Sequence, residues 1–283
     1  MHMLEVDPIQ LQSESDKRAV ADVHSEVLGR IRKAGVTPVE FFGDVIRRAI
    51  DEVLSLGSKR FSIKQLDPPE QAYIGMRVEM LVRDGLDVGK GITADAFIAG
   101  HEVDVKWSRS LGWMIGPENL GTVCLGLGTS GPNALFSVGI FVPRAEGLRK
   151  GQNRDKKYSL TAQFLRGGVD WLIQGAPTPP NFIEALDSDL RDEILRQPSA
   201  QRRLRRLAEL VPETPIPRSA IVFVSLNKDD PLRRVRADKS RRVAPLGEMV
   251  CLSEKYGRSS LHALGVDLPK NHFYFVHRDR IPV

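Results

Sequence analysis

The stretch from residue 92 to 107, ITADAFIAGHEVDVKW, restricts the possible folds of this chain more than any other. After its Ala-Gly turn, apolar and polar residues alternate with the period of two that is typical of a β-strand. Valine and tryptophan side chains take one face of this strand, and the other face carries Glu102, Asp104 and Lys106. A preceding segment, which begins at Asp95, completes a predicted β-hairpin. The chain therefore needs a sheet that carries charge on one surface.

The segments around this hairpin predict the rest of a mixed α/β domain. Apolar residues recur at helical spacing over residues 14 to 33, 37 to 56 and 69 to 85. Apolar runs at 121 to 127 and 134 to 142 are typical of buried strands. A mixed sheet flanked by helices is the fold class that follows.

A domain boundary is predicted at residues 174 to 181, QGAPTPPN, which hold three prolines, one glycine and no charged residue. Prolines and glycines in such numbers interrupt helices and strands. We expect one domain over residues 1 to 175 and a second over residues 176 to 283.

The second domain has the order of elements found in a winged helix. Residues 187 to 197 and 199 to 211 have the spacing of two helices joined by a short break at Gln197-Pro198. The segment AIVFVSL then predicts a strand, NKDDPLRRVRADKSRR a basic hairpin-like loop, and GEMVCL a returning strand. Helix, turn, helix, strand, basic loop and strand is the order of a winged-helix DNA-binding domain.

The distribution of charge points to a polyanionic partner. The formal net charge is +5, and residues 178 to 283 hold 19 basic and 14 acidic side chains, which accounts for the whole excess. Within that part, residues 198 to 242 hold 12 basic and 5 acidic side chains. Such a concentration suits nucleic acid.

Other classes of protein fit the composition poorly. No run approaches the roughly 18 apolar residues that a membrane span needs, and the start of the chain lacks a secretory pattern, so we expect a cytoplasmic protein with no membrane partner. The two cysteines, Cys124 and Cys251, are far apart and have neither a CxxC pair nor zinc-finger histidines nearby. A disulfide framework and a zinc site are not indicated.

Four residues form the candidate catalytic cluster. An Asp-x-Lys triplet such as Asp104 and Lys106 occurs by chance about once in a chain of this length, and the simplest alternative is a solvated strand face with an ion pair. Two further acids favour a site: the hairpin folds Asp95 back toward Asp104, and Glu79 lies in the preceding helix. Charges in a sheet between apolar segments are costly unless they have partners such as a metal ion.

These residue types suit phosphodiester hydrolysis with Mg²⁺. This ion prefers oxygen ligands in an octahedron and keeps several waters, so two carboxylates, a backbone carbonyl and a phosphate oxygen match it. Such a metal lowers the pKa of a bound water and neutralises charge at phosphorus. Lys106 would orient the attacking water.

The same residues resemble a known family. Asp95, followed after eight residues by Asp104-Val105-Lys106, is similar to the PD-(D/E)xK nuclease signature, with Ala94 in place of the proline. More closely, GMRVEMLVRD, GHEVDVKWS, WMIGPENLG and NRDKKYSLT resemble the NaeI-type family of type II restriction endonucleases. The similarity runs from about residue 40 to the end and includes RSAIVFVSL and LRRVRADKSRR.

This resemblance implies an endonuclease domain followed by a helix-turn-helix domain. Family members of this kind are homodimers that bind two copies of double-stranded DNA, one cleaved and one acting as an effector. Carried over by position, the catalytic residues are Glu79, Asp95, Asp104 and Lys106, and the metal ligands are Asp95, Asp104, Glu79 and the Val105 carbonyl. The chain departs from the family in SRSLG after the catalytic strand and in the helix at 199 to 211, which leaves the recognition sequence open.

Basic side chains in three regions are candidates for DNA contact. The helix at 199 to 211 carries four arginines with only Glu209 to pair with them, although a solvated helix face is the alternative. The loop at 148 to 159 would clamp phosphates or would serve as a soluble turn. The candidates are Arg109, Arg154, Lys156, Lys157, Arg202, Arg203, Arg205, Arg206, Arg233, Arg234, Arg236, Lys239, Arg241 and Arg242.

Three functional hypotheses remain open at the level of sequence. The first is a Mg²⁺-dependent, sequence-specific double-strand DNA endonuclease of restriction type. The second is a methylation-dependent or nicking nuclease of defence or repair. The third is a winged-helix DNA-binding regulator whose nuclease domain is inert, against which stands the presence of all four catalytic residues. His101 does not indicate an HNH nuclease, because no second histidine or asparagine has matching spacing, and we expect a surface histidine.

Overall fold

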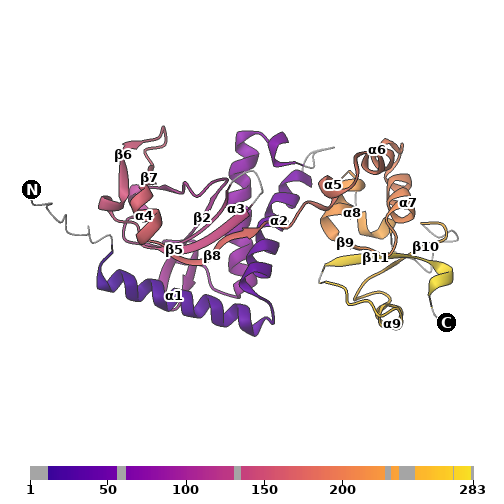
Figure 1. The fold of residues 1–283 in the computed structure, drawn as a ribbon, viewed down its shortest axis with the longest axis horizontal. Helices are drawn as coiled ribbons and strands as arrows, with labels where there is room; N and C mark the ends of the chain where they lie inside the picture. The colour runs from indigo at the N-terminus through magenta and orange to yellow at the C-terminus, as the bar shows by residue number, and fades with distance from the viewer. Residues whose placement is uncertain are drawn as a thin grey trace, which may run out of the picture. The chain divides into compact units, whose positions relative to one another are not determined.

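The computed structural model describes residues 12–55, 62–130, 135–226, 231–235, 246–269 and 271–281, without the side chains of residues 55 and 130. The chain forms two compact units (Figure 1). The first unit comprises Met1–Ala49 and Gln71–Pro179, and the second comprises Ile50–Glu70 and Pro180–Val283. Within the described residues, no helix has the length and hydropathy needed to span a bilayer.

A five-stranded mixed sheet is the centre of the first unit. Its strands lie in the order β1, β2, β4, β5, β8, and only β2 and β4 run parallel. The bounds are β1 Ala96–Ile98, β2 His101–Ser108, β4 Val123–Ser130, β5 Leu135–Phe141 and β8 Asp170–Pro177. The predicted hairpin and both predicted buried strands are therefore confirmed, as is the mixed α/β fold class.

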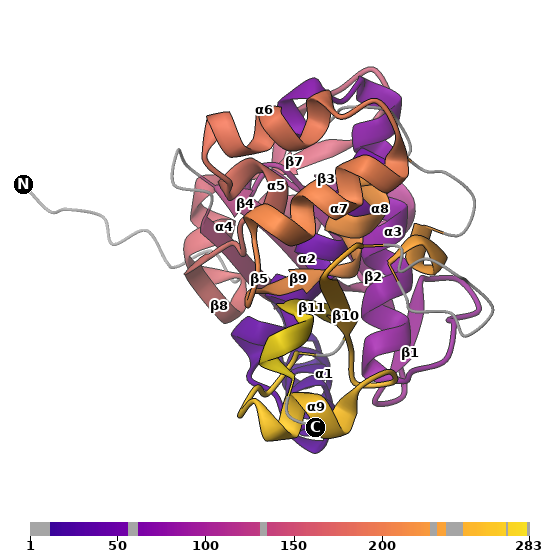
Figure 2. The ribbon, with the colours of Figure 1, turned by 90° about the vertical axis from the view of Figure 1, so that its right-hand side faces the viewer.

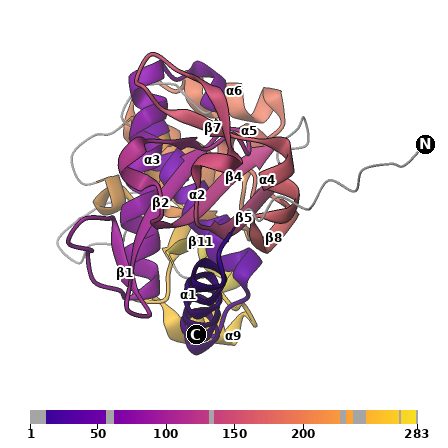
Figure 3. The same ribbon diagram turned by 90° about the vertical axis from the view of Figure 1, so that its left-hand side faces the viewer.

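Three long helices accompany this sheet in the chain, and all three were predicted. They are α1 Glu14–Lys33, α2 Pro38–Ser55 and α3 Pro68–Leu86. Helix α1 begins at Ser13, which forms a capping box with Asp16, and it buries Val20, Val23, Val27 and Ile31 as one stripe. This stripe packs against β5, β4 and β1, so α1 runs along one face of the sheet (Figure 3).

A small second sheet extends the first unit. Strands β3 Met114–Ile115, β7 Tyr158–Leu160 and β6 Leu148–Gln152 lie in the order β3, β7, β6, and α4 Ala162–Gly167 follows them. Trp113, Phe141 and Phe164 are fully buried in the cluster that joins these elements to β4 and β5. Trp113 lies so close to Gly126 of β4 that a Cβ at residue 126 would be 2.6 Å from the indole. The short turns η2 Pro117–Asn119 and η3 Ala145–Gly147 connect the strands.

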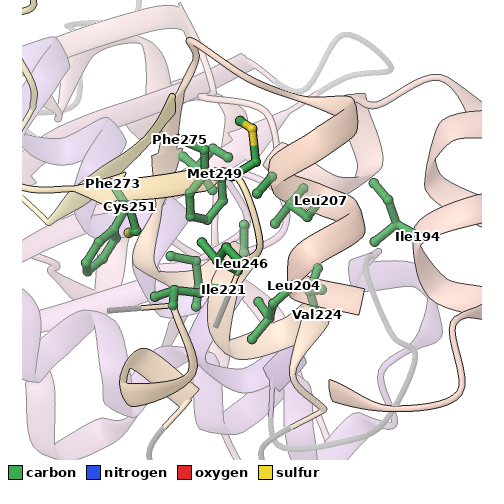
Figure 4. Packing of buried hydrophobic residues seen from close by; sticks show 14 of the residues in the cluster. Ile194, Leu204, Leu207, Ile221, Val224, Leu246, Met249, Cys251, Phe273 and Phe275 are labelled. Carbon is green, nitrogen blue, oxygen red and sulfur yellow. The ribbon is translucent and has the colours of Figure 1, made fainter. Parts of the chain in front are cut away.

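The second unit packs helices against a three-stranded antiparallel sheet (Figure 2). Strands β10 Met249–Leu252, β11 His272–His277 and β9 Pro215–Pro217 lie in the order β10, β11, β9. Figure 4 shows Leu204 and Leu207 meeting Ile221 and Phe275 in its core. The other elements are η1 Ile63–Gln65, α5 Phe182–Ala185, α6 Ser188–Arg196, α7 Ala200–Leu210, α8 Arg218–Val224, η4 Pro231–Arg234, α9 Arg258–Ala263 and η5 Arg278–Arg280.

Several details of the second unit differ from the sequence-based expectation. The segment AIVFVSL, predicted as a strand, lies mostly in helix α8, whose side chains Ala220, Ile221, Phe223 and Val224 are buried. The predicted helices at 187 to 197 and 199 to 211 are confirmed as α6 and α7, and β10 confirms a strand within GEMVCL. The expected linker at 174 to 181 is wrong in its first half, because residues up to Pro177 pair with β5 as part of β8. The assignment of domains at residues 175/176 and the winged-helix assignment stay predictions.

Candidate active site

The predicted Asp-x-Lys pair lies together on one face of β2. Val103 and Val105 are buried on the opposite face, as the alternation in the sequence predicts. The side chains of Asp104 and Lys106 are 13% and 17% exposed, and Lys106 Nζ lies 2.6 Å from Asp104 Oδ2. The attraction within an ion pair so little exposed to water is strong, and removal of either partner would leave an uncompensated buried charge.

Asp95 reaches the same place from the edge of the sheet. It directly precedes β1, whose Ala96 pairs with Val103 of β2. The Asp95 Oδ2 atom accepts a hydrogen bond of 2.8 Å from the Val105 N–H. The guanidinium of Arg83, on α3, donates to the Asp95 carbonyl at 3.0 Å. The hairpin therefore returns Asp95 beside the Asp104-Val105-Lys106 segment, as the sequence predicts.

Glu79 lies close enough to this cluster to interact with both aspartates. It projects from α3 and is partly buried. Burial, together with the negative charges of Asp95 and Asp104, raises the pKa of Glu79 to about 7. Burial also raises the pKa of Asp104, although the Lys106 ammonium opposes this shift. Three carboxylates thus repel one another around one ammonium, which is the electrostatic situation that a bound cation relieves.

Asn119 belongs to the site and was not predicted as a site residue. Its Nδ2 donates to Asp104 Oδ1 at 2.9 Å, and its Oδ1 accepts from Lys106 Nζ at 3.2 Å. With the ion pair between Asp104 and Lys106, these bonds close a triangle of three side chains. Asn119 ends the turn η2, and β4 begins shortly afterwards at Val123. Its segment, WMIGPENLG, carried the family resemblance, and that was the only signal for this residue.

The donor atoms fit a divalent cation that prefers oxygen. Among the described residues, no three His, Cys, Asp or Glu side chains converge closely enough to hold a metal ion by themselves. Asp95, Asp104 and the neighbouring Val105 carbonyl are hard oxygen donors, and Mg²⁺ commonly takes only one or two carboxylates and keeps waters. Glu79 as a direct metal ligand stays a prediction.

The basic hairpin of the first unit is exposed as expected for a DNA contact. The turn between β6 and β7 carries Arg154, whose side chain is 98% exposed, together with the exposed Lys156 and the partly exposed Lys157. Asn153 Oδ1 fixes the turn by accepting the N–H groups of Asp155 and Lys157 at 2.9 Å each. Arg109 lies after β2 and donates to Gln71 Oε1 on α3 at 2.8 Å. None of these four contacts with DNA is tested by the structure.

The arginines of α7 do not all behave as predicted. Arg203 is only 6% exposed, and its guanidinium donates to the Val224 and Gln197 carbonyls at 2.7 and 2.9 Å. Its burial contradicts the expectation that all four arginines lie beside the apolar stripe on an exposed helix face, and its contact with DNA stays a prediction.

The expectation that the α7 arginines have only Glu209 to pair with them is wrong. Arg206 forms ion pairs with Glu193 of α6 and with Glu209, and Arg205 pairs with Glu209 at 2.9 Å. Arg202 is exposed, and its side chain has no hydrogen-bond or ion-pair partner in the part of the chain that the structure describes. Arg202 and the half-exposed Arg205 are the better candidates for phosphate contact.

The remaining candidates for DNA contact lie in η4 and in the sequence that follows it. Arg233 and Arg234 lie on η4, where Arg234 contributes its carbonyl to a bond from Gln201 at 3.0 Å. The expected contacts from Arg236, Lys239, Arg241 and Arg242 lie outside the described residues. His101 pairs with Asp22 of α1 at 3.2 Å, in keeping with the expected surface histidine.

Comparison with known proteins decides the family. The family described as restriction endonuclease NaeI matches residues 37–280, which is most of the chain. The chain belongs to the NaeI family of restriction endonucleases. A type II restriction enzyme NaeI from Lentzea aerocolonigenes is 28% identical over 239 residues, which cover 80% of this chain and 74% of that enzyme.

Membership of the NaeI family makes this chain a site-specific deoxyribonuclease that acts on double-stranded DNA. Type II restriction endonucleases generally use divalent metal ions, in accord with the oxygen donors around Asp95 and Asp104. The family match spans both units, so both belong to the restriction enzyme.

Proposed function

We propose that the chain hydrolyses DNA phosphodiester bonds at a Mg²⁺-dependent site formed by Asp95, Asp104 and Lys106. The observation that supports this most strongly is the convergence of these side chains, with Asn119, from three separate segments onto one face of β2. When bound, the metal ion would supply positive charge against the scissile phosphate and would acidify a water.

The protein side chains have distinct roles in this proposal. Asp95 and Asp104, with the Val105 carbonyl, would hold the ion, and Glu79 would complete the negative surroundings. Lys106, beside Asp104, would donate a hydrogen bond toward the attacking water or the phosphate oxygen. Asn119 restrains both partners, because its amide is the donor to one and the acceptor from the other. The residues thus orient reactants, which is the larger part of catalysis in phosphoryl transfer.

The basic surfaces support binding of DNA by both units. The hairpin at 148 to 159 would contact phosphates that flank the cut, and Arg202 and Arg205 of α7 would contact a second stretch of DNA. Cationic side chains at phosphates release counterions, which supplies much of the affinity of such proteins. We propose that the enzyme is a homodimer and that a second copy of its DNA sequence, bound by the C-terminal unit, activates cleavage.

Digestion of plasmids with known and varied methylation tests this function. Discrete fragments with Mg²⁺ and none with EDTA are the expected result. Cutting that requires methylation, or only nicks one strand, would instead support a modification-dependent or nicking nuclease. An intact plasmid that is retarded on the gel would contradict the proposal and favour a DNA-binding regulator with an inert nuclease domain.

A further inference from the structure

Glu102 lies on the same strand as the catalytic pair but binds backbone rather than substrate. Its Oε1 accepts the Ile92 N–H at 2.9 Å, and its Oε2 accepts the Thr93 and Ala94 N–H groups at 3.0 and 2.8 Å. The Thr93 hydroxyl donates to the same Oε2 at 3.3 Å. One carboxylate thus collects three successive backbone donors, an arrangement in which the peptide groups form an anion-binding concavity.

The loop that carries these donors packs closely around the Glu102 carboxylate. The Phe97 N–H bonds to the Gly89 carbonyl at 2.9 Å and closes the loop at its base. A Cβ on Gly91 would lie 2.4 Å from Glu102 Oε2 and 2.8 Å from the Ala94 carbonyl oxygen. Glycine at 91 therefore permits the close approach of Glu102, and the loop conformation depends on the contact.

The anchored residues lead directly into a proposed metal ligand. Ala94 immediately precedes Asp95, whose carboxylate accepts the Val105 N–H and whose carbonyl accepts from Arg83. Those two bonds fix Asp95 itself. Among the side chains that the structure describes, the Glu102 carboxylate alone binds the backbone of the three residues before Asp95. Without Glu102, three adjacent N–H groups would turn to water and the backbone before Asp95 would lose its restraint.

We propose that Glu102 is a positioning residue that holds the loop at 92–94 and thereby places Asp95 for the divalent cation. This inference rests on the proposed function of Asp95. Residues that orient a metal ligand typically contribute 10- to 100-fold to metal affinity or activity. Loss of Glu102 should act through Asp95, so it should weaken the cation site without changing the ion pair between Asp104 and Lys106.

The test compares Glu102→Ala and Glu102→Gln with a matched control, Asp22→Asn. Asp22 lies on α1, and its carboxylate pairs with His101 at the start of β2. It has no hydrogen bond to the loop at 92–94. Hydrogen exchange of the Ile92, Thr93 and Ala94 amides in the metal-free protein reports the loop directly. Titration with Mn²⁺, followed by the electron paramagnetic resonance signal of the free ion, reports the cation site without DNA.

We expect Glu102→Ala to lower the protection factors of the three amides at least about tenfold. The affinity for Mn²⁺ should fall about 10- to 100-fold. Glu102→Gln keeps one acceptor oxygen and should retain part of both, while Asp22→Asn should match the wild type. Circular dichroism identifies any variant that is unfolded, and the glutamine variant then carries the comparison.

Two results would overturn the inference: unchanged amide protection in both Glu102 variants, or lost protection with unchanged Mn²⁺ affinity and cleavage. Failure of the proposed function has a different signature. A wild-type protein with protected amides that neither binds Mn²⁺ nor cuts DNA would contradict the metal-dependent nuclease, whereas the contact between Glu102 and the loop would stand.

Discussion

At the scale of residues, the proposed catalytic face of β2 combines groups that repel one another with groups that restrain them. Asp104 is held by Lys106 on one oxygen and by Asn119 on the other. A neutral amide is suited to this place, because it donates to a carboxylate and accepts from an ammonium at the same time. Either charged replacement would satisfy only one of the two partners.

Replacement of Asn119 should therefore slow cleavage while the protein stays folded. We expect Asn119→Ala to lower the single-turnover cleavage rate by about 10- to 100-fold, because Lys106 and Asp104 lose a shared restraint. DNA affinity, measured with Ca²⁺ in place of Mg²⁺, should change little. A wild-type rate in this variant would show that the triangle has no role in catalysis.

The ion pair between Asp16 and Arg144 offers a pH-dependent test of the first unit. The Arg144 guanidinium, with hydrogen bonds of 2.7 and 3.1 Å, lowers the pKa of Asp16, and the Asp16 side chain is only 6% exposed. A carboxyl group whose pKa is lowered in the folded state stabilises that state, and the contribution is complete when the pH is above the unfolded pKa. The contribution is lost as the pH falls through the folded pKa.

Asp16→Asn should lower the free energy of unfolding by about 1–2 kcal/mol at pH 7, a value reduced because Arg144 is half-exposed. The difference from wild type should shrink as the pH falls below the ordinary aspartate pKa of 3.8 and through the lowered pKa of folded Asp16, because the wild type then loses the charge as well. Urea unfolding followed by tryptophan fluorescence measures it, because all three tryptophans lie in the first unit. A difference that does not depend on pH would contradict an ionic cause.

At the scale of elements, helix α7 places neighbouring arginines in opposite environments. Arg203 lies in the stripe with Ala200, Leu204 and Leu207 and is buried, whereas Arg202 is exposed. Arg203→Ala removes the donor to the Val224 carbonyl and should cost about 2–3 kcal/mol in the second unit. Hydrogen exchange of the α7 amides measures this cost.

Arg202→Ala is the matched variant on the same helix and should have the opposite profile. It should leave exchange unchanged, weaken DNA binding, and reduce the slope of log affinity against log salt by about one. Equal effects of the two variants on stability, or on DNA affinity, would contradict the assignment of one buried and one exposed arginine.

The sequence predicted the three long helices and the hairpin of the first unit because each has a clear period. Asp95, Asp104 and Lys106 could be placed together, since a hairpin with a period of two permits only one arrangement of its faces. Asn119 could not, because it comes from a turn whose approach depends on the parallel pairing of β2 with β4. Its position is a property of the sheet and not of its local sequence.

Two predictions in the second unit failed for different physical reasons. The run AIVFVSL has no polar residue before Ser225, because α8 is buried on most of its sides, and an apolar run of that length does not distinguish helix from strand. Arg203 was misjudged as a member of a charge run, although its spacing from Ala200 and Leu207 places it on the buried stripe. Helical spacing applied to each arginine separately would have found it.

At the scale of the whole molecule, the proposal requires that DNA bound by one unit changes the activity of the other. If a second DNA copy is the effector, a one-site plasmid should be cut slowly and should be cut faster when a short duplex with the site is added. Arg202→Ala combined with Arg205→Ala should remove that acceleration and leave slow basal cleavage. Equal rates on one-site and two-site plasmids, unchanged by added duplex, would leave the second unit as a simple DNA clamp.

The central claim is that β2 and the segment before β1 carry the catalytic residues of this restriction enzyme. Single-turnover cleavage of a DNA substrate that the wild type cuts, measured for Asp104→Ala and Lys106→Ala, tests it most directly. Both variants should lose cleavage, while binding of the same DNA in Ca²⁺ should stay near wild type, because these groups act at the phosphate and not on base edges. Retention of more than about a tenth of the wild-type rate by both variants would contradict it.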